Sequence, residues 1–189
     1  MSTLTASVAA YTVLLTLLVA CGEHLSKPAA LSTALAAHRV VPSPSTVAAV
    51  VIATEGLLGA AGVVALLSDD GGRALGVVLA GSCALLATYA GYARYVTSTG
   101  RAVPCGCSRV ELPMTGWVVA RAATLAGMAL VGSLLSGAVV PLGRPGTSLT
   151  IVLLAAATFT ALLAHLPAAM HDPTPDQPPL GVTRGEVPG

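Results

Sequence analysis

The chain has 189 residues, of which 54% are hydrophobic and only 9% are charged, and its formal net charge is +1. A soluble domain carries roughly 25% charged residues, so this chain has too few charges to cover a soluble globule of its size. Lipid is therefore the expected solvent for most of its surface. The sequence contains no basic block, which argues against nucleic acid as a partner.

Five apolar segments are long enough to cross a bilayer as helices. Residues 1–22 contain no charged side chain, and about 20 apolar residues span the hydrocarbon core. Further spans are expected over residues 46–67, 74–95, 115–135 and 149–166. The sequence therefore predicts an all-α polytopic membrane protein with a four-helix transmembrane bundle and a fifth, C-terminal transmembrane helix.

The segments between the spans complete the expected organisation. Residues 26–41 carry a modest apolar stripe and are predicted to form a short interfacial helix lying on the bilayer. Residues 1–136 make up a four-span membrane domain, followed by a loop and the fifth span at 137–167. The Pro-rich tail at 168–189 has little to bury, and we expect it to be disordered.

Reactive side chains are crowded into one polar loop, which carries the sequence Cys105-Gly106-Cys107. Such a pair can close a disulfide when the glycine bends the chain, because bridged Cα atoms lie about 4.4–6.8 Å apart. A ring this small stabilises the fold by only about 1.6 kcal/mol, and its strain makes the disulfide labile. Exchange chemistry is therefore favoured over a structural staple. Two flanking guanidinium groups would favour the thiolate: Arg101 and Arg109.

The order of the spans places further potential ligands on the same membrane face as the cysteine loop. Two antiparallel spans separate the loop after the first span from the loop after the third, so both loops lie on one membrane face. Cys21 and His24 therefore share a face with Cys105 and Cys107. These four residues match a Cys₃His tetrahedral metal site. A metal-handling protein is thus the alternative to a redox protein, and a structural subunit without chemistry is a third interpretation.

The orientation of the cysteine face depends on two opposing arguments. Five basic residues lie on that face and three on the other, so the positive-inside rule favours a cytoplasmic loop. Cytosolic thiols are normally kept reduced, so a redox role favours the outer face. We expect an extracytoplasmic cysteine loop in the cell membrane, with the basic residues as the objection: Lys27, Arg39, Arg94, Arg101 and Arg109.

Two ionisable groups, Glu55 and Arg121, lie inside predicted spans, where such groups usually have a function or a partner. Counted from the cysteine face at 1.5 Å per residue, Glu55 lies about 13 Å deep and Arg121 about 12 Å deep. The matching depths predict an ion pair that satisfies both buried charges. In the other interpretation, Glu55 and Arg121 form a polar layer beneath the cysteine loop, and this layer carries protons or holds a quinone-like ligand.

The motifs and their order resemble a known family. Pro104-Cys105-Gly106-Cys107, placed after three spans and before a span with an early Arg121, resembles the methylamine utilisation protein MauE family. The segment Thr54-Glu55-Gly56-Leu57-Leu58-Gly59 is similar to the Glu-x-x-x-Gly signature in the second span of MauE and DoxX-like proteins. The resemblance covers roughly residues 4–136. It implies a redox-associated four-helix membrane protein, distantly similar to vitamin K epoxide reductase, with a thioredoxin-like or disulfide-containing protein partner.

The leading prediction is a membrane thiol–disulfide component or assembly factor that assists disulfide formation in an exported partner. Cys105 and Cys107 would carry the exchange, supported by Pro104, Gly106 and Cys21. The pattern establishes no cofactor, and a quinone or a metal ion are the candidates. If the protein is an enzyme in its own right, its expected activity is that of a thiol–disulfide oxidoreductase.

Overall fold

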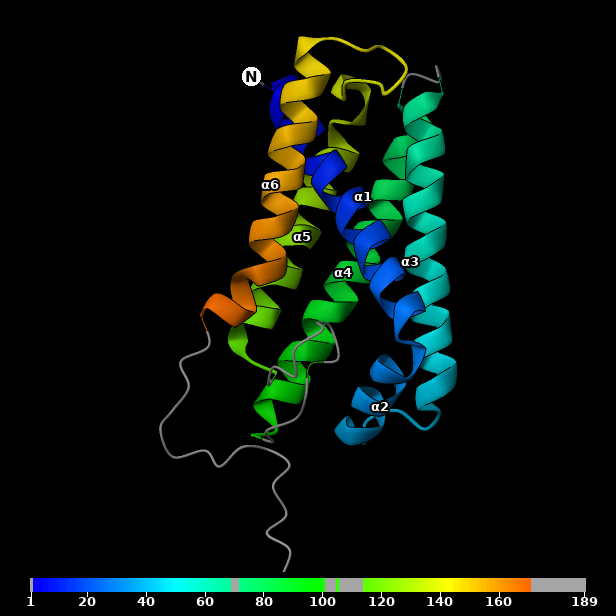
Figure 1. Cartoon of the computed structure of the whole chain (residues 1–189), viewed down its shortest axis with the longest axis vertical. Coiled ribbons are helices and arrows are strands. Elements are labelled where there is room, and N and C mark those ends of the chain that lie inside the picture. The colour runs from blue at the N-terminus through cyan, green and yellow to red at the C-terminus, as the bar shows by residue number, and fades with distance from the viewer. Residues whose placement is uncertain (1, 69–71, 101–104, 106–113, 171–189) are drawn as a thin grey trace, which may run out of the picture.

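The computed structural model describes residues 2–68, 72–100, 105 and 114–170. All regular secondary structure in these residues is helical (Figure 1). Its elements are α1 (Ser2–Ser26), α2 (Pro28–His38), α3 (Pro44–Leu67), α4 (Arg73–Ser98), α5 (Gly116–Leu134), the short 3₁₀ helix η1 (Ser136–Ala138) and α6 (Thr147–Ala169). Five of them, α1, α3, α4, α5 and α6, are long and apolar enough to cross a membrane. The predicted all-α class, with four spans and a fifth, is confirmed.

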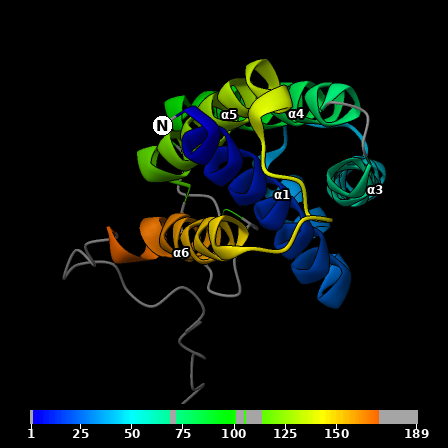
Figure 2. The same ribbon diagram turned by 90° about the horizontal axis from the view of Figure 1, so that it is seen from above.

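Helix α1 is the central element of the bundle. Of its most apolar window 56% is buried, against 22–28% for the other four long helices. It packs on α3, α5 and α6, and Figure 2 shows it running obliquely between the row made by α4 and α5 and the separate helix α6. Ala6, Ala10 and Val13 are fully buried. Such small side chains let neighbouring helices approach closely. The resulting van der Waals contacts hold the helices together in lipid, where the hydrophobic effect does not drive them to associate.

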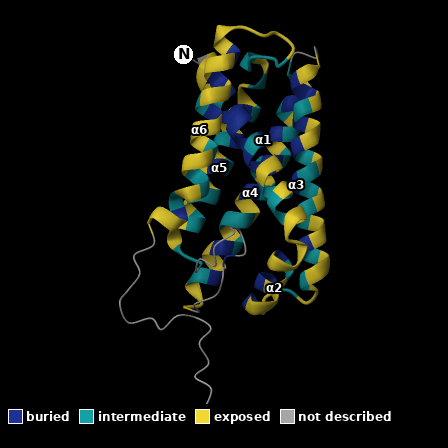
Figure 3. Ribbon diagram, viewed as in Figure 1, coloured by how far each residue is buried: buried dark blue, intermediate teal, exposed yellow. Residues whose placement is uncertain are grey.

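One apolar core joins all five long helices. Its members include Leu17 of α1, Leu66 of α3, Leu79 of α4, Leu125 of α5 and Val152 of α6. The outward faces of the long helices carry exposed leucine and valine side chains, and Figure 3 shows this division between the inner and outer faces. Because lipid is as apolar as leucine, such faces are stable in a bilayer.

Helix α6 contributes fully buried side chains to this core. Its Val152 and Ala156 are fully buried, and its Thr160 hydroxyl donates a 3.4 Å hydrogen bond to the Thr12 carbonyl of α1. The predicted fifth span at 149–166 therefore corresponds to a somewhat longer helix that packs on the centre of the bundle. Residues 171–189, which make up nearly all of the tail predicted to be disordered, lie outside the described residues.

Helix α2 lies at the end of the bundle where α1 finishes and α3 begins (Figure 1). It begins at Pro28, whose fixed φ suits the first turn of a helix. It ends at His38, and the next residue, Arg39, adopts the left-handed conformation with φ 54°. Its Leu31 and Leu35 pack against Ala48 of α3. The range 26–41 predicted for an interfacial helix thus contains a helix whose apolar side is buried against the bundle.

The end of α1 differs from its prediction. The helix does not stop at the end of the charge-free segment but continues through Glu23 and His24 to Ser26. Cys21 therefore lies inside the helix, more than one turn before its end. Because residues three apart lie on neighbouring positions of a helix surface, Cys21 and His24 are carried on the same side of α1.

Candidate functional site

A cavity of about 380 Å³ lies among the six α-helices, toward the end that holds α2 and Cys105. Ligand pockets typically measure about 300–1,000 Å³, so this volume suits a small molecule. Apolar side chains make up most of the lining, among them Leu31 and Leu35 of α2 and Val118 of α5. The polar side chains in the lining are Thr16, His24, His38, Glu55, Thr88, Tyr89, Tyr92, Cys105 and Arg121.

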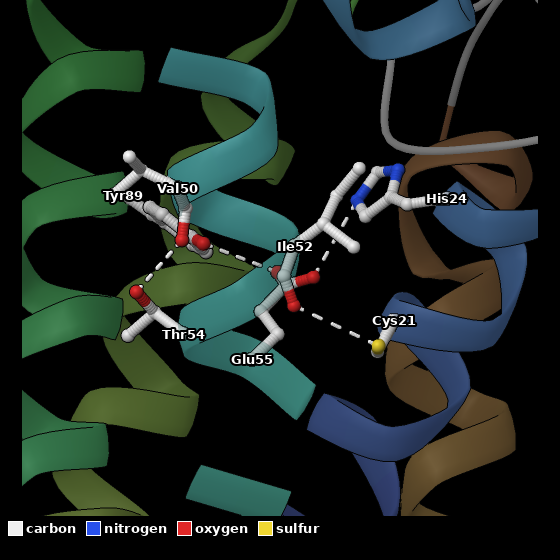
Figure 4. A network of polar contacts seen from close by, with 7 residues as sticks. All are labelled: Cys21, His24, Val50, Ile52, Thr54, Glu55 and Tyr89. Atoms are coloured by element: carbon white, nitrogen blue, oxygen red, sulfur yellow. Dashed lines mark hydrogen bonds and ion pairs between the residues drawn. The ribbon is translucent and has the colours of Figure 1, made fainter. Parts of the chain in front are cut away.

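Glu55 lines this cavity and is only 3% exposed. The Tyr89 hydroxyl donates a 3.1 Å hydrogen bond to its Oε1, and Nε2 of His24 lies 3.8 Å from its Oε2. Figure 4 shows the two residues approaching the carboxylate from different helices. A separation of 3.8 Å is too long for a hydrogen bond. Oε2 accordingly has no hydrogen-bond partner among the described residues, although buried polar groups normally have one.

The local sequence of α3 explains how Glu55 comes to face α1. A Cβ built on Gly59 would lie 2.7 Å from Leu18 Cδ2, so α3 approaches α1 closely at this point and a larger residue would require the Leu18 side chain to shift. Glu55 precedes Gly59 by about one turn and therefore lies on the same side of α3. The Glu-x-x-x-Gly signature thus combines a close helix contact with an acid directed toward the cavity.

Cys21 lies in this helix contact and is not part of the cavity lining. Its thiol donates a long hydrogen bond, 3.7 Å, to the carbonyl of Ile52 on α3 (Figure 4). A Cβ on Gly56 would lie 3.1 Å from its Sγ, so the thiol fills the space above that glycine. The structure therefore places Cys21 in helix packing while His24, one turn later, reaches the cavity.

Cys105 follows α4 and is 6% exposed, with its side chain lining the cavity. The remaining residues of the predicted loop site lie outside the described residues: Arg101, Pro104, Gly106, Cys107 and Arg109. The geometry of the Cys-Gly-Cys pair therefore stays a prediction. What the structure adds is that its first cysteine shares one cavity with Glu55 and His24.

The predicted direct ion pair between Glu55 and Arg121 is not among the contacts of the described residues. Both side chains line the same cavity, but the ion-pair contact of Glu55 is with His24, and Arg121 acts on the carboxylate only as a nearby charge. The reason is helix order: α3 packs on α1, α2 and α4, whereas α5 packs on α1, α4 and α6. Matching depths place two groups on one level, but they do not make their helices neighbours.

The structure describes only three of the four residues of the predicted metal site: Cys21, His24 and Cys105. Among the described residues, no group of three or more histidine, cysteine or acidic side chains is arranged to hold a metal ion. Cys107, the fourth predicted ligand, lies outside that part of the chain, and Cys21 is directed toward Ile52. The Cys21, His24, Cys105 and Cys107 set remains a prediction from spacing.

Two tyrosines that were not predicted as site residues also line the cavity. Tyr89 binds Glu55, and the hydroxyl of Tyr92 lies 2.8 Å from Nδ1 of the buried His38. The latter contact ties α2 to α4 at the wall of the cavity. The signal in the sequence was their spacing, because residues 89 and 92 lie three apart and share one face of a helix. Tyr95 is directed outward and is 57% exposed.

Comparison with known proteins identifies a family. The sequence model of the family described as methylamine utilisation protein MauE matches residues 1–135. The matched segment contains α1 to α5 and the cysteine loop, and it ends before α6. No curated protein and no solved structure matches the chain at a significant level.

Proposed function

The chain belongs to the methylamine utilisation protein MauE family, and we propose that this multi-pass membrane protein is a thiol–disulfide component that assists disulfide formation in an exported partner. The partner is a thioredoxin-like or disulfide-containing protein. The exchanging residues are Cys105 and Cys107, and the loop that carries them faces the extracytoplasmic side of the cell membrane, where disulfides persist.

The observation that carries this proposal is the surroundings of Cys105. A cysteine that serves only as a small apolar residue needs apolar neighbours alone, and Cys83, half-buried against the main core, is of that kind. Cys105 instead lines a cavity that also contains Glu55, His24 and Arg121. Positive groups near a cysteine favour the thiolate, which is the reactive form. Ionisable side chains are otherwise scarce in this chain, so their meeting around one cysteine supports chemistry there.

The proposed reaction transfers two electrons from the partner to the cysteine pair. A partner thiolate attacks one sulfur of the Cys105–Cys107 disulfide, which forms a mixed disulfide and releases the other cysteine as a thiolate. The second partner thiolate attacks the partner's own sulfur in that mixed disulfide, which releases the remaining cysteine. The partner has then gained one disulfide, and the pair has become a dithiol.

Thiol trapping in intact cells tests this proposal. A maleimide that adds mass to each free thiol is applied before and after mild reductant, to the wild type and to Cys105→Ser, Cys107→Ser and Cys83→Ser variants. We expect the wild type and Cys83→Ser to gain two reactive thiols on reduction. Cys105→Ser should leave the Cys107 thiol reactive without reductant, because its partner in the disulfide is gone.

The proposal fails if Cys105 and Cys107 react equally before and after reductant. Thiols that become reactive only after chelation would instead favour the metal-handling alternative. The same trapping with a reagent that does not cross membranes tests the proposed extracytoplasmic position of the loop. Labelling only after the membrane is opened would place the loop in the cytoplasm.

A further inference from the structure

We propose that a groove between α1, α5 and α6 holds the acyl chains of one bilayer phospholipid as part of the bundle. The groove has a volume of about 590 Å³, and none of its described lining residues also lines the cavity that contains Cys105. The family model ends at residue 135, before α6, so one wall of the groove lies outside the matched segment. Lipid binding there does not depend on the thiol chemistry proposed above.

The lining of the groove suits hydrocarbon. Its described lining residues carry no charge, and the only polar ones are Thr5 and Thr124. All three helices of its wall are long and apolar enough to cross a membrane. Water needs two to four polar partners in a buried position, which an apolar groove does not supply. The occupant is therefore expected to come from the interior of the bilayer.

Small residues create the groove. Gly127 of α5 has no side chain, and no atom lies within 4 Å of a Cβ built there. Ala9 of α1 lines the groove with a buried methyl group. Figure 2 shows α1 between α5 and α6, and α6 packs more extensively on α1 than on α5. An unfilled hollow forfeits the van der Waals contacts of its lining, so an occupant that fills it stabilises this arrangement.

The depth of the groove matches one leaflet of the bilayer. Helices α1 and α6 begin, and α5 ends, at the same end of the bundle (Figure 1). Counted from this end at 1.5 Å per residue, the lining extends from about 3 Å at Leu4 to about 18 Å at Phe159. The hydrocarbon core is about 30 Å thick, so each leaflet fills about 15 Å. The lipid therefore comes from the leaflet opposite the cysteine loop.

The volume of the groove favours acyl chains over a transmembrane helix of a partner. A helix about 30 Å long and about 10 Å wide fills roughly 2,400 Å³, about four times the volume of the groove. Such a helix would lie across the opening and leave the hollow above Gly127 unfilled. An acyl chain is narrow and flexible, so it can reach Ala9 and Gly127 between the helices.

Acyl chains in the groove should exchange more slowly than the surrounding lipid. They contact side chains of three helices at once, whereas a chain on an outer face of the bundle contacts only the side that faces it. The additional van der Waals contacts favour retention. The same contacts join α6 to α5 within one leaflet, where these two helices leave a gap.

Native mass spectrometry can count the retained lipid. The full-length protein is reconstituted in vesicles of palmitoyl-oleoyl-phosphatidylcholine and then extracted into dodecyl maltoside, which replaces the lipid on the outer faces. We expect one phosphatidylcholine molecule to remain bound to each protein chain.

Two exposed helical glycines supply a matched pair of variants. No atom lies within 4 Å of the Cβ built on Gly127 or on Gly91 of α4, but only Gly127 lines the groove. Gly127→Phe places a ring in the space of the acyl chains and should lower the lipid-bound fraction by about tenfold or more. Gly91→Phe should retain lipid as the wild type does. Circular dichroism shows whether each variant has folded.

A second pair on α5 keeps the test decisive if Gly127→Phe does not fold. Val131 is 38% exposed and lines the groove, whereas the adjacent Leu130 is 50% exposed and does not. Val131→Trp should therefore lose the phosphatidylcholine, and Leu130→Trp should keep it.

The lipid counts decide between three occupants. Lipid that is kept by the wild type and the two control variants, and lost from the folded groove variants, supports the proposal. A wild type that retains no phosphatidylcholine, or equal retention in all folded variants, overturns it. A mass of two protein chains that Gly127→Phe reduces to one also overturns it, because the groove would then be an interface between copies of this chain.

Discussion

Replacing Gly62 by alanine tests whether the core depends on the close approach of α3 to α1. Gly62 is buried in α3, and a Cβ built on it would overlap Leu14 Cδ2 and lie 2.8 Å from Leu14 Cδ1. Leu14 belongs to α1 and is only 3% exposed, so its side chain has no free space into which to turn. The added methyl group must therefore push the two helices apart or force Leu14 from its rotamer.

The expected magnitude combines two opposing terms. Overpacking a core by a small group costs about 1–3 kcal/mol, whereas alanine is favoured over glycine inside a helix by about 1 kcal/mol. Gly62→Ala should therefore lower the free energy of unfolding by about 0–2 kcal/mol, the difference of those terms. Gly91 of α4 supplies the control, because no atom lies within 4 Å of the Cβ built there. Gly91→Ala should show the propensity gain alone.

The free energy of unfolding can be measured by titrating each variant with sodium dodecyl sulfate in mixed micelles, followed by circular dichroism. The difference between Gly62→Ala and Gly91→Ala isolates the steric term and should amount to about 1–3 kcal/mol. If both variants are stabilised equally, α3 and α1 do not meet at Gly62 as closely as the structure shows.

Three tyrosines on α4 give the remaining predictions. Tyr89→Phe removes the hydrogen bond to the buried Glu55 and should cost about 1–3 kcal/mol, because it leaves a buried acceptor with no donor; the same detergent titration measures this loss. Tyr92→Phe removes the contact that ties His38 of α2 to α4, so limited proteolysis should cut the α2 region faster than in the wild type. Tyr95→Phe alters an exposed side chain and should change neither result; an equal effect in all three variants would show that the two inner hydroxyls contribute nothing specific.

The spans were predictable because the thickness of the bilayer fixes their length. A charge-free or nearly charge-free run of about 20 residues has few alternatives to a transmembrane helix, and turns rich in Gly, Pro and Asp mark its ends. The shared face of His24 and Cys105 followed from counting spans, and the structure places both side chains in one cavity. These inferences needed only the order of the helices along the chain.

The arrangement of the helices was not predictable in the same way. Helices α1 and α3 have the same mean hydropathy of 2.1, yet 56% of the window in α1 is buried, against 28% in α3. In a membrane, side chains that face lipid are as apolar as those that face the core, so hydropathy does not separate the central helix from a peripheral one. The contacts of Glu55 with Tyr89 and His24 were not foreseen for the same reason. The depth of Glu55 in the membrane could be counted along the sequence. The neighbours of its side chain, however, depend on which helices flank α3.

The burial of α6 has a consequence for how the protein is made. The Thr160 hydroxyl and the Thr12 carbonyl that it meets are 148 positions apart, so α1 enters the membrane well before α6 has been synthesised. At about 5–20 residues per second, that interval lasts about seven to thirty seconds. Throughout it, the side of α1 that will meet α6 is still without this neighbour. Native assembly of the bundle is therefore a late event, completed only after the last helix has been inserted.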